Sequence, residues 1–556
     1  MHSSFLRALT AAALTVLALA AFTTTAGANP RITDPFYSYT GSEPLASIPP
    51  GTLLKTRTVP YHLGNIPLPL PVKVVQLLYR SSDMLGRPAV NVTSVIVPFT
   101  GRPDRRLVAY GSFYDSLDPR DQPSMAIAGH SNPTLGGALA NVEFMMIAGL
   151  VGQGFTVVVT DTEGQNADFA AGPEYGINTL DAIRAVLGSD TVDMPDETRV
   201  GLTGYSGGAI ATEWAAELAP RYAPDVNRRL VGAVMGGVLI DPAHNLHYVE
   251  GSSLWSGVMP MALVGIARAF EIDLTPYMSE LGVELNEKLQ NASIVDVLGR
   301  YSGLRWRDLA KPEYSVPESI PLFVGVANRL IMGAGGAPTV PLAIYQGAGG
   351  EIEGTSGQKV GIGPGDGVMI AGDVRTLARQ YCATGLAVDY HEYADLSHTG
   401  ASGQWLAAAP GWLADRFAGT PAPQNCASIK PGNPLDPIPM PVTAQEPQPA
   451  PNSPVQPVTI PDLAPVARGY TAPTVTVPSG GQSVGSASAP RADVRRIRVV
   501  GKRKVRADLF CDGTSAQRCV VVLKVTVRVK GRVRSLGSVR VSVRGGSAVT
   551  KTFALN

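Results

Sequence analysis

A strand-like run, a serine between glycines and an Ala-rich stretch follow one another around residue 206. Residues 199–203 have the pattern of a short strand, and Gly204-Tyr205-Ser206-Gly207-Gly208 comes next. Residues 209–219 have the composition of a helix. A serine between a strand and a helix lies on a sharp, strained turn, and glycines two positions away let the strand and the helix pack closely. The order predicts a serine presented on a strand-to-helix turn.

The pentapeptide alone carries little weight, because the chain has 60 glycines and a second match occurs at Gly481-Gln482-Ser483-Val484-Gly485. Ser483 has no strand-like run before it and no helical stretch after it, and it lies in a segment rich in Pro, Gly and Ser. A nucleophilic serine of this type requires both neighbours. Ser206 is therefore the expected nucleophile.

Composition divides the chain into three parts after the N-terminal segment. Residues 29–426 alternate apolar runs such as 156–160 with Ala-rich stretches such as 210–219, which predicts an α/β fold with a parallel sheet. Residues 421–490 hold 17 of the 46 prolines, so 427–490 is expected to be an extended linker. Residues 491–556 alternate valine with polar residues, which predicts a small, sandwich-like all-β module.

The N-terminus has the pattern of a secretory signal. Arg7 precedes an uncharged run at 8–22, and Ala26-Gly27-Ala28 provides a small-residue cleavage site. The run is shorter than the ~20 residues of a membrane span. The apolar stretch 254–267 is also too short and is expected to be a buried helix. We therefore expect residues 1–28 to be removed, the protein to be secreted, and no stable membrane span.

Charge is distributed unevenly along the chain. Lys and Arg number 46 against 45 Asp and Glu, a net charge of +1, yet residues 491–556 contain 17 basic and three acidic residues. Residues 491–556 therefore carry a net charge of +14, and the rest of the chain carries a net charge of −13. This asymmetry suggests that the module contacts an anionic cell envelope or polymer, although a solvated charged face is an equal alternative. Nucleic acid is not expected as a partner, because aromatic residues are not interleaved with the basic ones.

Four cysteines are too few for a disulfide scaffold, and their spacing contains no C-x-x-C motif of a zinc or redox site. In an oxidising compartment two local pairs are expected, one between Cys511 and Cys519 and one between Cys382 and Cys426. The four residues allow three connectivities.

Elimination selects the base that would activate Ser206. In α/β folds with a nucleophilic serine on a strand-to-helix turn, the serine comes first along the chain, then the acid, then the histidine. This order excludes His2, His62 and His130, which precede Ser206. His244 and His247 come too early to leave room for an acid-bearing strand, and no third ligand accompanies them for a metal. His391 lies within the strand-like run 388–393, whereas His398 follows it, where a loop is expected to carry the base. No metal or other cofactor is expected.

The acid should follow the strand-like run 342–347. The residues directly after this run, Ala348-Gly349-Gly350-Glu351, contain no Asp. Asp366 is the next candidate, because a helical stretch at 373–382 comes after it. Glu351 is the alternative.

Several motifs together resemble the secretory lipase family, the fungal lipase A type with bacterial relatives. They span about residues 45–426 and comprise 50–54, 110–116, 161–164, 204–208, 341–347 and the spaced His398. The resemblance implies an α/β-hydrolase with a helical cap at 241–320, and a triad of Ser206, Asp366 and His398. It also implies an oxyanion hole from the backbone N–H groups of Asp115 and Gly207, and a disulfide between Cys382 and Cys426. Two features depart from the family: the Tyr-Gln-Gly run lacks its usual downstream Asp, and residues 351–365 are inserted.

These observations lead to one expected function. A secreted serine hydrolase would cleave carboxylic esters through an acyl-enzyme, with triacylglycerols as the expected substrates. The alternatives are a short-chain carboxylesterase, the same serine chemistry used for acyl transfer or peptide cleavage, and a catalytically silent protein that binds the envelope.

Overall fold

The computed structural model describes residues 32–99, 106–132 and 134–441, together with the backbone of five strands between residues 492 and 554. The chain divides into two compact units, residues 1–472 and 473–556. The predicted signal segment, residues 1–28, lies outside the described residues, as do residues 442–490 of the predicted linker.

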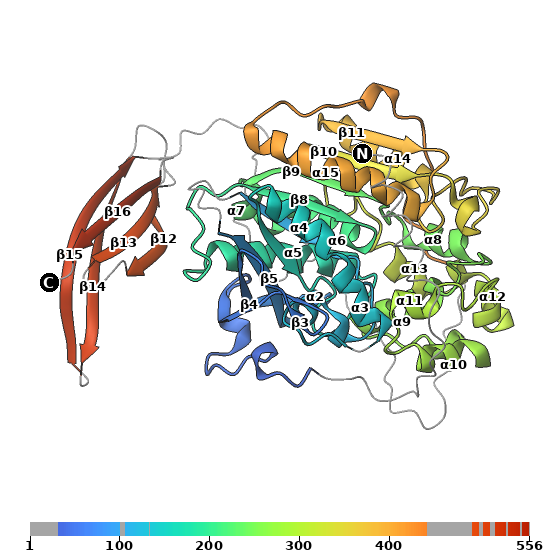
Figure 1. Ribbon diagram of the computed structural model, residues 1–556, viewed down its shortest axis with the longest axis horizontal. Coiled ribbons are helices and arrows are strands. Elements are labelled where there is room, and N and C mark those ends of the chain that lie inside the picture. The colour runs from blue at the N-terminus through green and yellow to red at the C-terminus, as the bar shows by residue number, and fades with distance from the viewer. Residues whose placement is uncertain are drawn as a thin grey trace, which may run out of the picture. The chain divides into compact units, whose positions relative to one another are not determined.

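A nine-stranded sheet forms the centre of the first unit (Figure 1), in the order β1-β4-β5-β7-β6-β8-β9-β10-β11. The six strands from β7 to β11 in this order run parallel, and β1, β4 and β5 extend the sheet in antiparallel fashion at one edge. The strands are β1 (Leu53–Val59), β4 (Val72–Ser82), β5 (Pro88–Pro98), β6 (Leu107–Gly111), β7 (Thr156–Thr160), β8 (Val200–Tyr205), β9 (Leu230–Gly236), β10 (Leu342–Gly347) and β11 (Val388–Tyr393).

Both faces of this sheet are buried, because side chains alternate between two hydrophobic clusters. On β7, Val157 and Val159 belong to one cluster and Val158 to the other. Strands covered on both faces have the continuous apolar character that the sequence displays. Helices α5 (Gly172–Leu187), α6 (Gly207–Tyr222) and α14 (Ala371–Ala383) contribute to one cluster, and α2 (Pro123–Ile127), α4 (Phe144–Gly152) and α15 (His398–Ala418) to the other. The predicted α/β fold is confirmed.

Six helices lie between β9 and β10 in the sequence (Figure 1). They contribute to a third hydrophobic cluster, which also contains residues 362 and 368–370. They are α8 (Pro242–Val249), α9 (Val258–Ala269), α10 (Glu280–Lys288), α11 (Ile294–Val297), α12 (Trp306–Leu309) and α13 (Pro321–Ala327). We refer to these helices and the loops that join them as the cap. The cap contains the expected buried helix as α9, and it continues through α13, past the expected end at residue 320. The remaining elements of this unit are α3 (Leu135–Val142), α7 (Pro224–Asn227) and a hairpin of β2 (His62–Leu63) and β3 (Ile66–Pro67).

The described beginning of the predicted linker packs against the first unit. The side-chain amide of Asn433 donates to the carbonyl of Ile362 at 2.9 Å and to Asp373 at 2.7 Å. Further on, the Ile438 N–H donates to Asn328 at 2.7 Å. The folded body therefore extends beyond residue 426, where the sequence predicts the linker to begin.

A disulfide joins Cys382 at the end of α14 to Cys426, across 44 residues of sequence. This is the pairing that the family resemblance implied. Cys511 and Cys519 lie on β13 and β14, and their side chains are outside the described residues, so their pairing stays a prediction.

The second unit consists of two antiparallel sheets. One contains β12 (Ala492–Val499), β13 (Lys504–Cys511) and β16 (Ala548–Ala554), and the other contains β14 (Arg518–Val529) and β15 (Arg532–Arg544). The valine alternation thus corresponds to long antiparallel strands. In the part of the chain that the structure describes, no helix has the length and apolar character needed to cross a membrane.

Candidate active site

Ser206 lies at the turn between β8 and α6 in a strained conformation, with φ +55° and ψ −120°. The close packing of this turn explains its glycines. A Cβ on Gly208 would lie 2.0 Å from the carbonyl oxygen of Gly111, and a Cβ on Gly204 would lie 2.1 Å from that of Gly208. Only glycine fits at these positions without moving the backbone.

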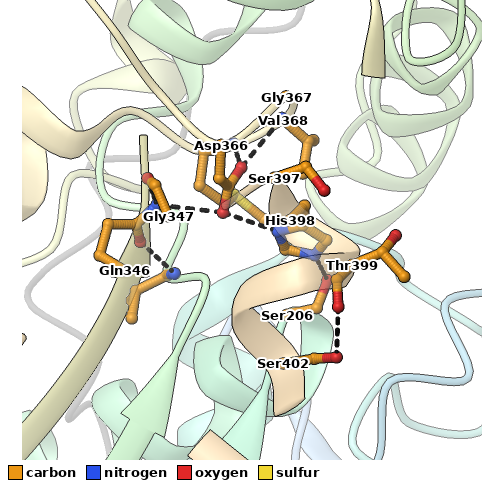
Figure 2. Close-up of polar contacts among 12 residues, drawn as sticks. Ser206, Gln346, Gly347, Asp366, Gly367, Val368, Ser397, His398, Thr399 and Ser402 are labelled. Atoms are coloured by element: carbon orange, nitrogen blue, oxygen red, sulfur yellow. Dashed lines mark hydrogen bonds and ion pairs between the residues drawn. The ribbon is translucent and has the colours of Figure 1, made fainter. Parts of the chain in front are cut away.

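The structure brings Ser206, His398 and Asp366 into one hydrogen-bonded chain, although they are far apart in the sequence (Figure 2). His398 Nε2 lies 2.9 Å from Ser206 Oγ, and His398 Nδ1 lies 2.8 Å from Asp366 Oδ2. Each residue follows the carboxyl end of a parallel strand, β8, β11 and β10 respectively, and such ends meet at one edge of the sheet. The arrangement has the geometry in which a base removes the proton of a serine hydroxyl while an acid orients the base.

Asp366 is fully buried and held as an acceptor on both oxygens. Its Oδ1 accepts the backbone N–H groups of Val368 at 3.1 Å and Met369 at 2.7 Å, and its Oδ2 accepts the side-chain amide of Gln346 at 3.0 Å (Figure 2). Glu351, the alternative acid, is exposed, and its carboxylate accepts the Gly357 N–H at 3.0 Å. Asp366, not Glu351, is therefore the carboxylate placed against His398.

His398 is the first residue of α15, not part of a loop as expected from the sequence. Ser397 caps the helix, and its hydroxyl accepts the Gly400 N–H at 3.3 Å. Helix α15 contains three glycines and a proline, which disfavour a helix, so its composition does not predict one. Packing against the sheet stabilises this helix instead. His391, the other histidine in the required order, pairs with Asp389 at 3.1 Å.

The imidazole of His398 is buried between two aromatic rings. The ring of Tyr205 lies 5.1 Å away between centroids, and Trp255 meets the imidazole edge-on at 5.4 Å. Burial disfavours the protonated ring, but the negative charge and hydrogen bond of Asp366 outweigh it, so the pKa of His398 is raised. The site thus stabilises the imidazolium that a general base becomes.

Asp115 and Gly207, the expected oxyanion-hole residues, lie together beside Ser206. Asp115 follows β6 with a positive φ of 33°, and its Oδ1 lies 1.8 Å from where a Cβ on Gly207 would be. Gly207 begins α6, so its N–H has no partner within the helix. Both residues line the same cavity as Ser206. Burial raises the pKa of Asp115 to about 7.

The cavity above Ser206 is almost wholly apolar and encloses about 110 Å³. Cap helices α8, α9 and α13 supply much of its lining, including Leu246, Val249, Met259, Ala262 and Phe323. The polar side chains of the lining are those of Asp115, Ser206 and Asn245. An apolar lining of this kind suits a hydrocarbon group bound beside the serine.

Two residues of the site were not predicted from the sequence. Trp255 of the cap lies against His398, and Glu353 from the inserted segment accepts a hydrogen bond from its indole N–H at 2.8 Å. The insertion itself was the available signal, but nothing in the spacing indicated that it reaches the cap. In the described residues, no three His, Cys, Asp or Glu side chains are grouped so that they could hold a metal ion.

Comparisons with known proteins agree with this architecture. Residues 131–425 match the secretory lipase family. A probable inactive lipase of Mycobacterium tuberculosis is 31% identical over 67% of this chain and 79% of its own length. The trichothecene C-3 esterase of Fusarium sporotrichioides is 32% identical over 70% of this chain and 84% of its own. Among solved structures, Candida antarctica lipase A in its closed state has a similar fold, with a TM-score of 0.61 at 23% identity, covering 75% of this chain and 92% of that one.

Proposed function

The chain belongs to the secretory lipase family of α/β-hydrolases, and on this basis we propose that it is a secreted serine hydrolase that cleaves long-chain carboxylic esters such as triacylglycerols. The observation that carries the proposal is the hydrogen-bonded chain Ser206–His398–Asp366 at the end of an apolar cavity. The lipases and esterases among its relatives support ester hydrolysis as the reaction.

The geometry of the site supports the following mechanism. His398 Nε2 takes the proton of Ser206 Oγ as the oxygen attacks the ester carbonyl carbon, and Asp366 stabilises the imidazolium that results. The backbone N–H groups of Asp115 and Gly207 bind the oxyanion of the tetrahedral intermediate. The imidazolium then protonates the departing alcohol, leaving an acyl group on Ser206. Water then attacks the acyl-enzyme as His398 takes its proton. The intermediate collapses, the imidazolium returns the proton to Ser206 Oγ, and the carboxylic acid is released.

The cavity supports a long acyl group as the part of the substrate that the protein recognises. Its lining would remove a hydrocarbon chain from water, at about 0.8 kcal/mol for each buried CH₂ group. A short acyl group would leave most of this surface without a partner. The alternative within the same chemistry is a short-chain carboxylesterase.

Hydrolysis of p-nitrophenyl esters from acetate to palmitate tests the proposal, with Ser206→Ala as the control. Serine-dependent turnover whose kcat/KM rises with chain length is the expected result. Turnover confined to short esters would make the protein a carboxylesterase. Transfer of the acyl group to an added alcohol in preference to water would make it an acyltransferase.

A catalytically silent protein is the second candidate, because the relative from Mycobacterium tuberculosis bears the name of a probable inactive lipase. The missing Asp after β10 is consistent with it, although Asp366 occupies the place beside His398. If the wild type hydrolyses every ester no faster than Ser206→Ala does, this candidate is favoured.

We also propose that the protein is secreted and that residues 491–556 contact an anionic polymer of the cell envelope. The disulfide between Cys382 and Cys426 is consistent with an oxidising compartment. The 17 basic residues of this segment supply the charge. Binding of the full chain to isolated envelope should weaken as salt rises from 50 to 500 mM, and loss of residues 491–556 should abolish it. Unchanged binding without the segment would exclude it as the anchor.

A further inference from the structure

The segment from Gly350 to Gly367, between β10 and α14, connects the cap to the triad. The N–H of Ser253 donates to the Gly354 carbonyl at 3.2 Å, and the hydroxyls of Ser252 and Thr355 are 2.8 Å apart. Its last residues are Asp366 and Gly367, and Thr355 donates to the Gly367 carbonyl at 2.6 Å. One continuous segment therefore carries the triad acid at its end and contacts the cap nearer its beginning.

Glu353 lies at the centre of this connection and accepts one hydrogen bond on each carboxylate oxygen. Its Oε2 accepts the indole N–H of Trp255 at 2.8 Å, and its Oε1 accepts the backbone N–H of Thr399 at 3.0 Å. Trp255 belongs to the cap, whereas Thr399 directly follows His398 in the first turn of α15 (Figure 2). Hydrogen bonds to an ionised carboxylate are about twice as strong as neutral ones, and negative charge is favourable at a helix N-terminus.

Trp255 transmits the position of Glu353 to the base. Its ring meets the His398 imidazole edge-on at an interplanar angle of 82°, while Tyr205 packs against the imidazole from β8. Glu353 and Trp255 also pack closely against Gly367, the residue after Asp366. A Cβ on Gly367 would lie 2.8 Å from Glu353 Oε2 and 2.9 Å from Trp255 Nε1. Glu353 therefore fixes one of the two rings that hold the imidazole.

Three carboxyl groups lie close enough to His398 to act on its charge, each from a different part of the fold. They are Asp366 from the loop before α14, Glu353 from the inserted segment and Asp115 from the loop after β6. The phenol of Tyr205 donates to the backbone carbonyl of His398 at 2.6 Å, and Ser206 lies at Nε2. Against the effect of burial, the charges of Asp366 and Glu353, and that of Asp115 where it is ionised, raise the pKa of the imidazole.

We propose that Glu353 is a positioning residue for His398: it holds Trp255 against the imidazole and the Thr399 N–H at the start of α15, which keeps Nε2 aligned with Ser206 Oγ. Its charge also stabilises the imidazolium that forms when Ser206 transfers its proton. This role rests on the proposed ester hydrolysis. It gives the inserted segment a role in the reaction, because residues 351–365 supply the support of the histidine and lead directly into Asp366.

Glu353→Gln tests the role, since it keeps the size of the side chain, removes the charge and leaves one oxygen where two accepted hydrogen bonds. Glu351→Gln is the matched control, because it makes the same change two residues away on an exposed side chain whose carboxylate accepts the Gly357 N–H. Trp255→Phe is the second variant, which retains an aromatic ring but loses the indole N–H and the larger bicyclic ring. Titration with a fluorophosphonate counts the functional sites, so every kcat refers to folded enzyme.

For Glu353→Gln we expect kcat on p-nitrophenyl butyrate to fall about tenfold, the effect of losing one hydrogen bond to a charged group, with KM nearly unchanged. The acidic limb of kcat/KM against pH should move to lower pH, because the imidazolium loses a nearby negative charge. Trp255→Phe should lower kcat without moving this limb, and Glu351→Gln should match the wild type.

Wild-type kcat and an unmoved acidic limb in Glu353→Gln would overturn the role of Glu353. A loss of titratable sites with normal kcat per site would also overturn it, because the residue would then be merely structural. If Glu353→Gln does not fold, a wild-type kcat in Trp255→Phe overturns the alignment through Trp255. A wild-type protein without serine-dependent turnover would instead overturn the proposed function, so the two failures are distinct.

Discussion

Asp366 and His398 are joined twice, once through side chains and once through the backbone. The carboxylate Oδ2 of Asp366 lies 2.8 Å from His398 Nδ1, and the backbone carbonyl of Asp366 accepts the His398 N–H at 2.6 Å. The second bond ties the loop before α14 to the start of α15. The orientation of the imidazole is therefore fixed by the chain as well as by the charge.

Replacing the acid should remove most of the activity. Asp366→Asn keeps the shape of the side chain but favours the wrong imidazole tautomer, and we expect kcat to fall about 10⁴-fold. Glu351→Gln should retain kcat within about twofold. Steady-state hydrolysis of p-nitrophenyl butyrate measures both, and a severe loss in Glu351→Gln with little loss in Asp366→Asn would reverse the assignment.

The sequence predicted the elements whose local pattern is strong. Strands β7, β10 and β11 have the expected bounds, because each is a run of residues with high strand preference that is buried in the sheet. Helix α15 was not predicted, since Gly400 and Gly403 oppose a helix that tertiary packing stabilises.

The order of Ser, acid and His predicted Ser206 and His398 but left two carboxylates open. The choice between Asp366 and Glu351 depends on how the inserted segment folds back, which has no local signal. The contact of Glu353 with Trp255 joins residues 98 positions apart, and no periodicity or spacing reports such a contact. Tertiary structure alone provides it.

Activity should decline on the alkaline side as Asp115 ionises. Burial raises the pKa of Asp115 to about 7, so its carboxyl is neutral below that pH and negative above it. A carboxylate beside Gly207 would repel the oxyanion, and hydrolysis should fall as pH rises through about 7. In Asp115→Asn this decline should disappear. A pH profile of kcat/KM from 5 to 9 measures it, and an identical alkaline limb in both proteins would exclude Asp115 as its cause.

The disulfide should stabilise the first unit through the unfolded state. Cys382 and Cys426 close a loop with a sequence separation of 44 residues, and the entropy of such a loop corresponds to about 4 kcal/mol of unfolding free energy. Urea unfolding of a variant with Cys382→Ser and Cys426→Ser should show this loss relative to the oxidised wild type. Equal midpoints and slopes for the two proteins would contradict the prediction.

Filling the cavity should affect long acyl chains selectively. Ala262 on α9 lines the cavity, whereas Ala267 on the same helix does not. For Ala262→Trp we expect kcat/KM on p-nitrophenyl palmitate to fall at least about tenfold, with acetate within about twofold of the wild type. Ala267→Trp is the control for the added bulk. Equal losses on both esters would mean that the acyl chain binds elsewhere.

The proposed hydrolysis requires Ser206 to be an activated nucleophile, and covalent labelling tests this directly. Folded wild-type protein is treated with a fluorophosphonate, and intact mass and peptide mass are measured beside Ser206→Ala and His398→Ala. We expect a single adduct on the peptide containing Ser206, no adduct in Ser206→Ala and much slower labelling in His398→Ala. A folded wild-type protein that takes up no label, or that is labelled at another residue, would contradict this role of Ser206.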